Sequence, residues 1–203
     1  MNLSAKDQKR IVAAIRAAEK KTSGEIYCVM AAASSNYRFL AIARAAVVAL
    51  AVPLPLFLFT TWWAEEIYLA QILTFIVCAA LFSVTPLRHW FIGGWIKRER
   101  ASHEAKRQFA AHGLHLTKAR TGVLIFVSVA ERYAEVVADS GINAKVPQKT
   151  WDSAIEALID NIKAGKAADG YVEAIRICGE VLAEHFPAGK RNRNELPDRL
   201  ILI

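Results

Sequence analysis

The sequence lacks most of the patterns that identify an enzyme or a cofactor-binding protein. It contains no glycine-rich phosphate loop, no nucleophile elbow and no zinc-protease helix motif. Its three cysteines, Cys28, Cys78 and Cys178, lie far apart and follow no zinc, redox or disulfide spacing, which agrees with a reducing compartment. The first residues also lack the apolar core of a signal peptide. No catalytic mechanism therefore follows from sequence motifs.

Charged side chains are missing from two long apolar runs, Ala45 to Trp63 and Ile67 to Leu87. A membrane-spanning helix needs roughly 20 mostly apolar residues, and each run meets that length. The alternative is a pair of buried helices in a soluble bundle, but such helices keep a polar stripe, of which these runs have little. We therefore expect a two-helix transmembrane hairpin over residues 38–96, with spans at about 43–63 and 67–88.

The tip between the two runs, "WWAEEIY", contains no Lys or Arg, whereas basic residues flank both ends of the hairpin. The positive-inside rule therefore places both ends of the hairpin, and both termini, in the cytosol of an inner-membrane protein. Basic and aromatic side chains near the span ends are expected at the membrane interface. These residues are Arg44, Trp62, Trp63, Arg88, Trp90 and Trp95.

The rest of the chain alternates between helical and strand patterns. An amphipathic helix is expected at about 5–21 with Ser4 as its N-cap, and a strand in "SGEIYCVM" follows it. After the hairpin come a helix that ends at Gly113, a strand that is apolar on both faces, a second strand, and two helices. This order predicts a three-layer α/β sandwich interrupted by the hairpin. Its parts are residues 1–37 and 97–186, and a flexible basic tail is expected at 187–203.

The formal net charge of +7 raises the question of a nucleic-acid partner. The basic residues gather beside the apolar block and in the stretch "GKRNRN", and no nucleic-acid motif accompanies them. This distribution favours anionic lipid headgroups. We expect the lipid bilayer and other membrane proteins as partners, and no nucleic acid.

Three stretches resemble the TPM domain family, known from thylakoid-lumen and photosystem-repair proteins and from many bacterial membrane-linked proteins. They are "TSGEIYCVMAAASSNY", "RTGVLIFVSVAERYAEVVADSGINAKVP" and "TWDSAIEALIDNIKAGKAADGYVEAIRICGEVLAEHFP". The resemblance implies an α/β sandwich. It also implies the divalent-cation binding and phosphatase activity proposed for relatives, with Glu131 and Asp139 as matching acids and Glu25 and Asp152 as further candidates. Gln148 stands where relatives often have an acid, and the hairpin splits a domain that is usually uninterrupted and outside the cytosol.

Carboxylates at strand ends can coordinate Ca²⁺ or Mg²⁺, so Glu131, Asp139 and Asp152 are the candidate metal ligands. The alternative is that Glu131 and Arg132 form a polar turn, that Asp139 begins a turn, and that Asp152 opens a helix near its positive end. His112 and His115 are too few to form a metal site by themselves.

Two functions are left open by these observations. The first is a binding or assembly and maintenance module for membrane proteins, which the hairpin and the missing catalytic motifs favour. The second is a divalent-metal-assisted phosphatase at the membrane surface, which the family resemblance implies.

Overall fold

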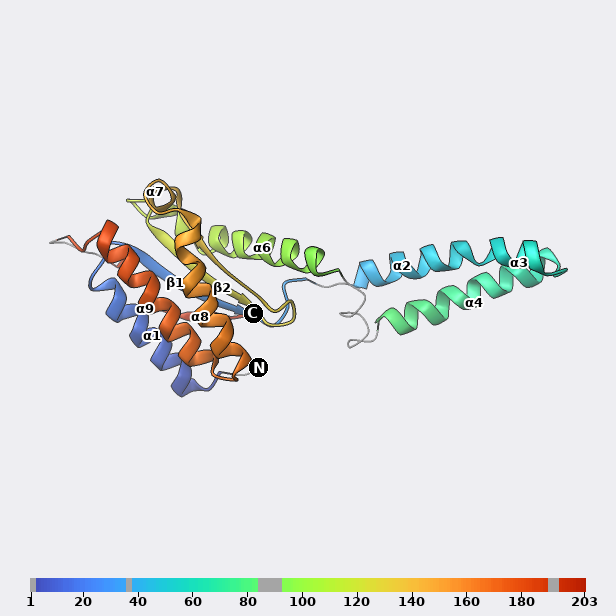
Figure 1. Cartoon of the computed structure of the whole chain (residues 1–203), viewed down its shortest axis with the longest axis horizontal. Coiled ribbons are helices and arrows are strands. Elements are labelled where there is room, and N and C mark those ends of the chain that lie inside the picture. The colour runs from blue at the N-terminus through green and yellow to red at the C-terminus, as the bar shows by residue number, and fades with distance from the viewer. Residues whose placement is uncertain (1–2, 36–37, 84–92, 190–193) are drawn as a thin grey trace. The chain divides into compact units, whose positions relative to one another are not determined.

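The computed structural model describes residues 3–35, 38–83, 93–189 and 194–203. The chain forms two compact units, one made of Met1–Ser34 with Arg98–Ile203 and the other of Ser35–Lys97. The first unit contains the sheet, and the second contains the apolar hairpin (Figure 1).

A four-stranded sheet with the order β3-β2-β1-β4 forms the centre of the first unit. Strands β1 (Glu25–Ala31) and β2 (Gly122–Ser128) are parallel neighbours, and every residue of both is buried. Strand β3 (Tyr133–Ala138) runs antiparallel to β2, and β4 (Leu200–Leu202) runs parallel to β1. The expectation that the continuously apolar strand is central is confirmed, because β2 has a neighbour on each side.

Helices cover both faces of this sheet. One face carries α1 (Ala5–Glu19), α8 (Asp152–Lys163) and α9 (Ala167–His185), whose apolar residues share a core with Ile26, Cys28 and Val136. The other face carries α6 (Gly94–Ala111) and η1 (Leu114–Leu116), which meet Tyr27 and Phe126. Two short elements, α7 (Ser140–Asn143) and η2 (Gln148–Trp151), connect β3 to α8. The three-layer α/β sandwich is therefore confirmed.

The helix ends follow from local sequence. At the start of α1, the Ser4 hydroxyl accepts a hydrogen bond from the Asp7 N–H (3.1 Å), and the Asp7 carboxylate accepts one from the Ser4 N–H (3.3 Å). This capping box confirms Ser4 as the N-cap. Helix α6 ends shortly before Gly113, which adopts a left-handed conformation (φ 70°) as expected.

The sequence also predicts a break between the last two helices from Gly165 to Gly170, and the observed break is shorter. It extends over residues 164–166, and Gly170 lies inside α9. A Cβ at Gly170 would stand 3.0 Å from the Leu158 carbonyl oxygen, so this glycine permits close packing of α9 on α8.

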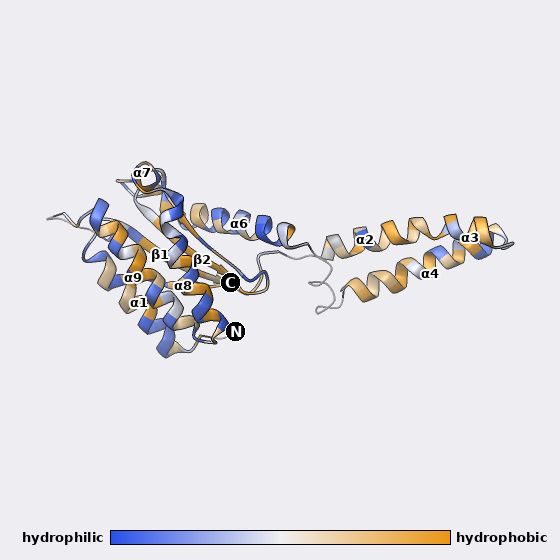
Figure 2. Cartoon of the chain, in the orientation of Figure 1, coloured by the Kyte–Doolittle hydropathy of each residue, from blue (hydrophilic) through white to orange (hydrophobic). Residues whose placement is uncertain are grey.

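The second unit contains α2 (Arg38–Ala51), α3 (Pro53–Phe59) and α4 (Ala64–Ser83). Helices α2 and α4 contact each other, and Ala41, Ala45 and Ala49 of α2 are buried. Most of the large apolar side chains of these helices are exposed. Figure 2 colours much of these helices orange, which marks hydrophobic residues. Two stretches, Ala41–Phe59 and Ala64–Ser83, are long and apolar enough to cross a membrane. The expected end of the second span at residue 88 lies outside the described residues.

The last residues of the sequence differ from the expected flexible tail. Leu200–Leu202 form β4 and pair with Cys28, Val29 and Met30 of β1. This strand covers the edge of the sheet that β1 would otherwise expose.

Candidate functional site

A hydrogen-bonded group of two serines and one carboxylate lies at the carboxyl ends of the two central strands. The Ser34 hydroxyl donates to the Ser128 hydroxyl (2.6 Å), and the Ser128 hydroxyl donates to the Glu131 carboxylate. The Ser34 N–H also donates to the Glu131 carboxylate (3.0 Å). Ser128 and Glu131 are both buried, and Ser34 is the last residue of its unit before the hairpin. The group therefore fixes the position at which the chain leaves β1.

The turn between β2 and β3 gives Arg132 an unusual backbone. The Arg132 N–H donates to the Val129 carbonyl (3.2 Å), and Arg132 has a φ of 52°. A left-handed conformation is disfavoured for a residue with a Cβ, because Cβ approaches the following carbonyl oxygen. The Arg132 side chain is exposed and forms no ion pair with a described residue.

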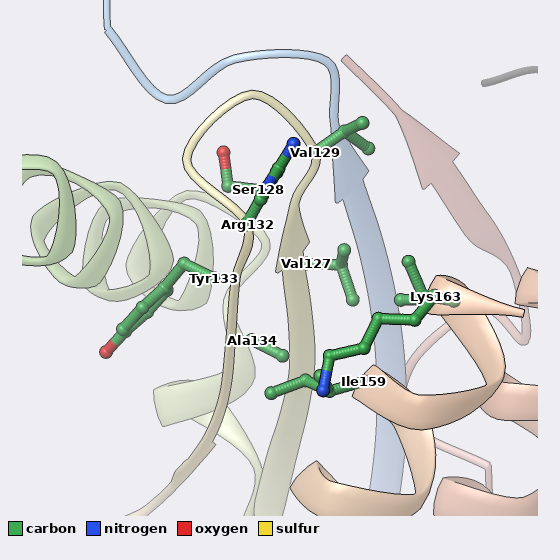
Figure 3. A pocket seen from close by; sticks show the side chains of 9 residues that line it. Val127, Ser128, Val129, Arg132, Tyr133, Ala134, Ile159 and Lys163 are labelled. Carbon is green, nitrogen blue, oxygen red and sulfur yellow. The ribbon is translucent and has the colours of Figure 1, made fainter. Parts of the chain in front are cut away.

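A pocket of about 480 Å³ lies between this turn and the last turns of α8 (Figure 3). Figure 3 shows Val127 and Ala134 pointing toward Ile159 and Lys163 of α8, whereas Tyr133 points away from them. The Lys163 ammonium group pairs with Asp160 (3.1 Å), but both side chains are largely exposed, so the pair is weak. The pocket thus combines an aliphatic wall with positive charge. Its lining residues are Val127, Ser128, Val129, Arg132, Tyr133, Ala134, Ile159, Ile162 and Lys163.

Tyr133 belongs to the opposite face of the sheet. Its hydroxyl donates to the Glu135 carboxylate (3.0 Å), which also accepts from Ser102 of α6 (3.3 Å). Burial, with the nearby Glu135 carboxylate, raises the pKa of Tyr133 to about 12. Tyr133 is therefore a neutral hydrogen-bond donor that helps hold α6 on the sheet.

The expected metal ligands do not come together. Glu131 precedes β3 and Asp139 follows it, and the six residues of β3 separate their backbones by about 20 Å. Asp139 is buried, caps α7 through the Ser140 N–H (2.6 Å) and pairs with Arg120 (3.1 Å). Asp152 is exposed in the first turn of α8. The structure therefore does not bring Glu131, Asp139 and Asp152 into one acidic pocket, because β3 places Glu131 and Asp139 at its opposite ends.

The further candidates have structural partners. The Glu25 carboxylate at the start of β1 accepts hydrogen bonds from the N–H groups of Glu195 (3.0 Å) and Leu196 (3.3 Å). The Gln148 amide donates to the Val136 carbonyl (2.9 Å). Within the described part of the chain, no group of three His, Cys, Asp or Glu side chains is arranged to hold a metal ion. These residues do not fit a shared Ca²⁺ or Mg²⁺ site.

Four of the expected membrane-interface residues lie within the described ranges. Trp62 and Trp63 are exposed between α3 and α4, and Trp95 is exposed in the first turn of α6. Arg44 lies in α2. Arg88 and Trp90 fall outside the described residues.

Ser34 and Ser128 were not singled out from the sequence. A polar residue at the carboxyl end of a continuously apolar strand is a signal that could have identified Ser128, since ligands of open α/β sheets bind beyond the carboxyl ends of the strands. Ser34 offers no comparable local signal.

The fold defines a class of protein, an α/β sandwich domain interrupted between its first two strands by an apolar helical hairpin. Residues 96–181, from within α6 to within α9, match the family model described as the TPM domain. The chain therefore carries a TPM domain, and the resemblance drawn from the sequence is confirmed.

A solved structure supports the same fold. The chain is similar to the NMR structure of the BA42 protein from the psychrophilic bacterium Bizionia argentinensis, with a TM-score of 0.63 and 25% sequence identity. The match covers 100% of this chain and 96% of that chain. A comparison with curated proteins finds no match.

Proposed function

We propose that this protein is anchored in the membrane by its hairpin and uses its cytosolic TPM domain to bind other membrane proteins during their assembly or maintenance. The exposed apolar side chains of α2, α3 and α4 support the anchor, since a water-soluble domain rarely exposes so much contiguous apolar surface. Basic residues flank the hairpin and are missing from its tip, which supports the cytosolic orientation.

Arg132 at the pocket is the observation that carries the binding role. Glycine would relieve its left-handed backbone, which costs an arginine roughly 1–2 kcal/mol. Backbone preference therefore does not explain why an arginine stands at this position. Its side chain offers a reason, because an exposed guanidinium can bind a carboxylate through two parallel hydrogen bonds. With the aliphatic wall beside it, the pocket suits an apolar segment that carries an acidic side chain.

Affinity capture from detergent-solubilised membranes tests this role. The wild-type chain, tagged after Ile203, is expected to retain one or more specific membrane proteins. Arg132→Asn should reduce their recovery by at least about tenfold, because it removes a charge-assisted contact worth roughly 1.5–3 kcal/mol. Asparagine tolerates the left-handed backbone, so the variant should remain folded.

The matched control is Lys149→Gln, which removes an exposed positive charge from η2 and should leave recovery unchanged. Equal recovery by Arg132→Asn and Lys149→Gln would reject the pocket as the binding site.

The same tag tests the orientation of the chain in the membrane. A protease added to intact spheroplasts should leave the tag uncut, and cleavage would place that end outside the cytosol.

A phosphatase acting at the membrane surface is the second candidate, favoured by the chain of hydroxyls from Ser34 through Ser128 to Glu131. A carboxylate that receives a proton along such a chain can activate a serine as a nucleophile. If this role is correct, Glu131→Gln should lower hydrolysis of p-nitrophenyl phosphate by at least about 100-fold, measured with Mg²⁺ or Ca²⁺ added. The exposed Asp152→Asn should retain activity, and a wild-type rate equal to that of buffer would eliminate this candidate.

A further inference from the structure

Residues 194–203 lie along the outer edge of β1. Beyond the three pairs that β4 makes, the Ile203 N–H donates to the Met30 carbonyl (3.0 Å), and the Ala32 N–H donates to the Ile203 carbonyl (2.6 Å). Strand β1 has seven residues, but β4 pairs with only three of them. The segment therefore pairs with one end of β1, and the other end of β1 makes different contacts.

Side chains interrupt the ladder at Ile26. In the register of β4, Asp198 would stand opposite Ile26, because Leu200 stands opposite Cys28. The Ile26 N–H instead donates to the Glu19 carboxyl group (2.8 Å), which also hydrogen-bonds the Asp198 side chain. Asp198 in turn pairs with Arg16 of α1 (2.9 Å). A side chain thus occupies a place where a longer strand would supply a backbone carbonyl.

The contacts of the segment define what this edge accepts. The Arg199 guanidinium donates to the Tyr27 hydroxyl (2.8 Å) and lies 5.8 Å from the centre of its ring. Leu200 packs against the core below α1 and α9, and Ile201 packs against the core on the opposite face. The edge therefore accepts a basic residue followed by aliphatic residues.

The end of the segment is only partly buried on this edge. Leu202 and Ile203 remain 47% and 46% exposed, so only about half of each residue is buried. A short edge strand that is only partly buried opens more readily than the central strands of a sheet. Its covalent connection also gives it a high effective concentration relative to a competing strand.

We propose that the edge of β1 from Ile26 to Ala32 is a docking site for an extended segment of a partner membrane protein. This partner segment has a basic residue followed by aliphatic residues, and it adds a parallel strand in place of residues 194–203. The positive-inside rule makes basic residues next to aliphatic ones common at the cytosolic ends of membrane spans, which supports a partner of this kind. The site rests on the proposed binding role but does not use the pocket beside Arg132, and so adds a second docking surface.

Binding of a labelled peptide to the full chain in detergent tests this site. The probe is a fluorescein-labelled peptide with the sequence of residues 194–203, "NELPDRLILI", measured by fluorescence anisotropy. In the protein, Ile203→Pro removes the donor to the Met30 carbonyl, whereas Ile203→Ala keeps this donor and shortens the side chain. We expect the Ile203→Pro chain to bind the peptide about tenfold more tightly than the Ile203→Ala chain.

A control peptide and a second measurement complete the test. A peptide with Ile201→Pro should not bind, because alternate residues of a strand direct their N–H groups to the same neighbour as Ile203 does. Hydrogen exchange on the wild-type chain should show faster exchange in residues 198–203 than in β2. Equal peptide binding by the two folded Ile203 variants would overturn the proposal, as would exchange in this segment as slow as in β2.

The oligomeric state and the capture experiment separate this site from its alternatives. A wild-type dimer that disappears in Ile203→Pro would show that the occupant is the same segment of a second copy. If Arg132→Asn loses its captured partner while the peptide still binds to the edge, the strand-docking site stands and the pocket site is the source of the capture. If the peptide fails to bind the edge while Arg132→Asn still loses its captured partner, the site on β1 is rejected and the proposed function stands. If the peptide binds while Arg132→Asn keeps its partner, the pocket is rejected and the site on β1 stands.

Discussion

Gly122→Ala is expected to lower the free energy of unfolding by about 3 kcal/mol, because the new methyl group has no space. A Cβ at Gly122 would lie 2.5 Å from the carbonyl oxygen of Leu114 and 3.0 Å from its Cβ. Strand β2 cannot easily move away, since Gly122 stands opposite Glu25 in β1 and its carbonyl accepts the Asp139 N–H (2.9 Å). The strain must therefore displace η1 from the sheet.

The thermal midpoint of the purified protein, measured by circular dichroism at a fixed heating rate, checks this effect. A loss of about 3 kcal/mol corresponds to a decrease of roughly 6–12 °C for a chain of this size. Gly189→Ala is the matched control, because no atom of the described residues beyond its chain neighbours lies within 4 Å of a Cβ at that position. A Gly122→Ala midpoint that equals the Gly189→Ala midpoint would contradict the close packing of η1 on β2.

Much of the fold was predictable because its causes are local. The apolar run of β2 indicated a strand covered on both faces, and the Ser4 capping box indicated the start of α1. The two uncharged runs indicated the hairpin by length alone. In each case the residues that set the structure lie within one helix or one strand.

The candidate site was less predictable because the chain brings it together from distant positions. Ser34 and Ser128 are 94 residues apart, and the hairpin lies between them. Glu131 was identified from the family resemblance and its place at a strand end, but its serine partners were not. The grouping of Glu131 with Asp139 was avoidable, since two acids at opposite ends of one extended strand of this length cannot bind the same ion.

The strand β4 was missed for a related reason. Its three residues are too few to show an alternating pattern, and the preceding basic stretch "GKRNRN" suggested a solvated tail. Its position depends on the edge of β1, which lies about 170 residues earlier in the chain, as the hydrogen bond between Arg199 and Tyr27 illustrates. Pairing at this separation leaves no local signal in the sequence.

Glu19→Gln is expected to stabilise the protein near pH 8 and to remove part of its pH dependence. Burial raises the pKa of Glu19 from 4.5 to about 8; the Ile26 N–H opposes this rise, and the Glu25 and Asp198 carboxyls add to it. In the unfolded chain this carboxyl loses its proton near pH 4.5, whereas the folded chain keeps the proton until about pH 8. The protonated Glu19 carboxyl therefore contributes its full stabilisation below pH 4.5, and this stabilisation is lost as the pH rises to 8.

The loss across this window is on the order of 2–3 kcal/mol, reduced from the full linkage value because the side chain is partly exposed. Glutamine keeps an oxygen acceptor for the Ile26 N–H, carries no charge and can donate to Asp198. The wild-type thermal midpoint should fall by roughly 5–10 °C between pH 5 and pH 8, and the variant should lose most of this decrease. Midpoints measured across this range check the prediction.

The control and the competing assignment use two other glutamates. Glu156→Gln neutralises an exposed carboxylate on α8 and should preserve the wild-type slope. Burial also raises the pKa of Glu25, so a slope that survives in Glu19→Gln but disappears in Glu25→Gln would assign the titration to Glu25.

If Glu19 is the group, its proton also controls residues 194–199, because the ionised form would place two carboxylates side by side where Glu19 meets Asp198. Hydrogen exchange in residues 198–203 should then speed up toward pH 8 in the wild type beyond its intrinsic rise, and should not do so in Glu19→Gln.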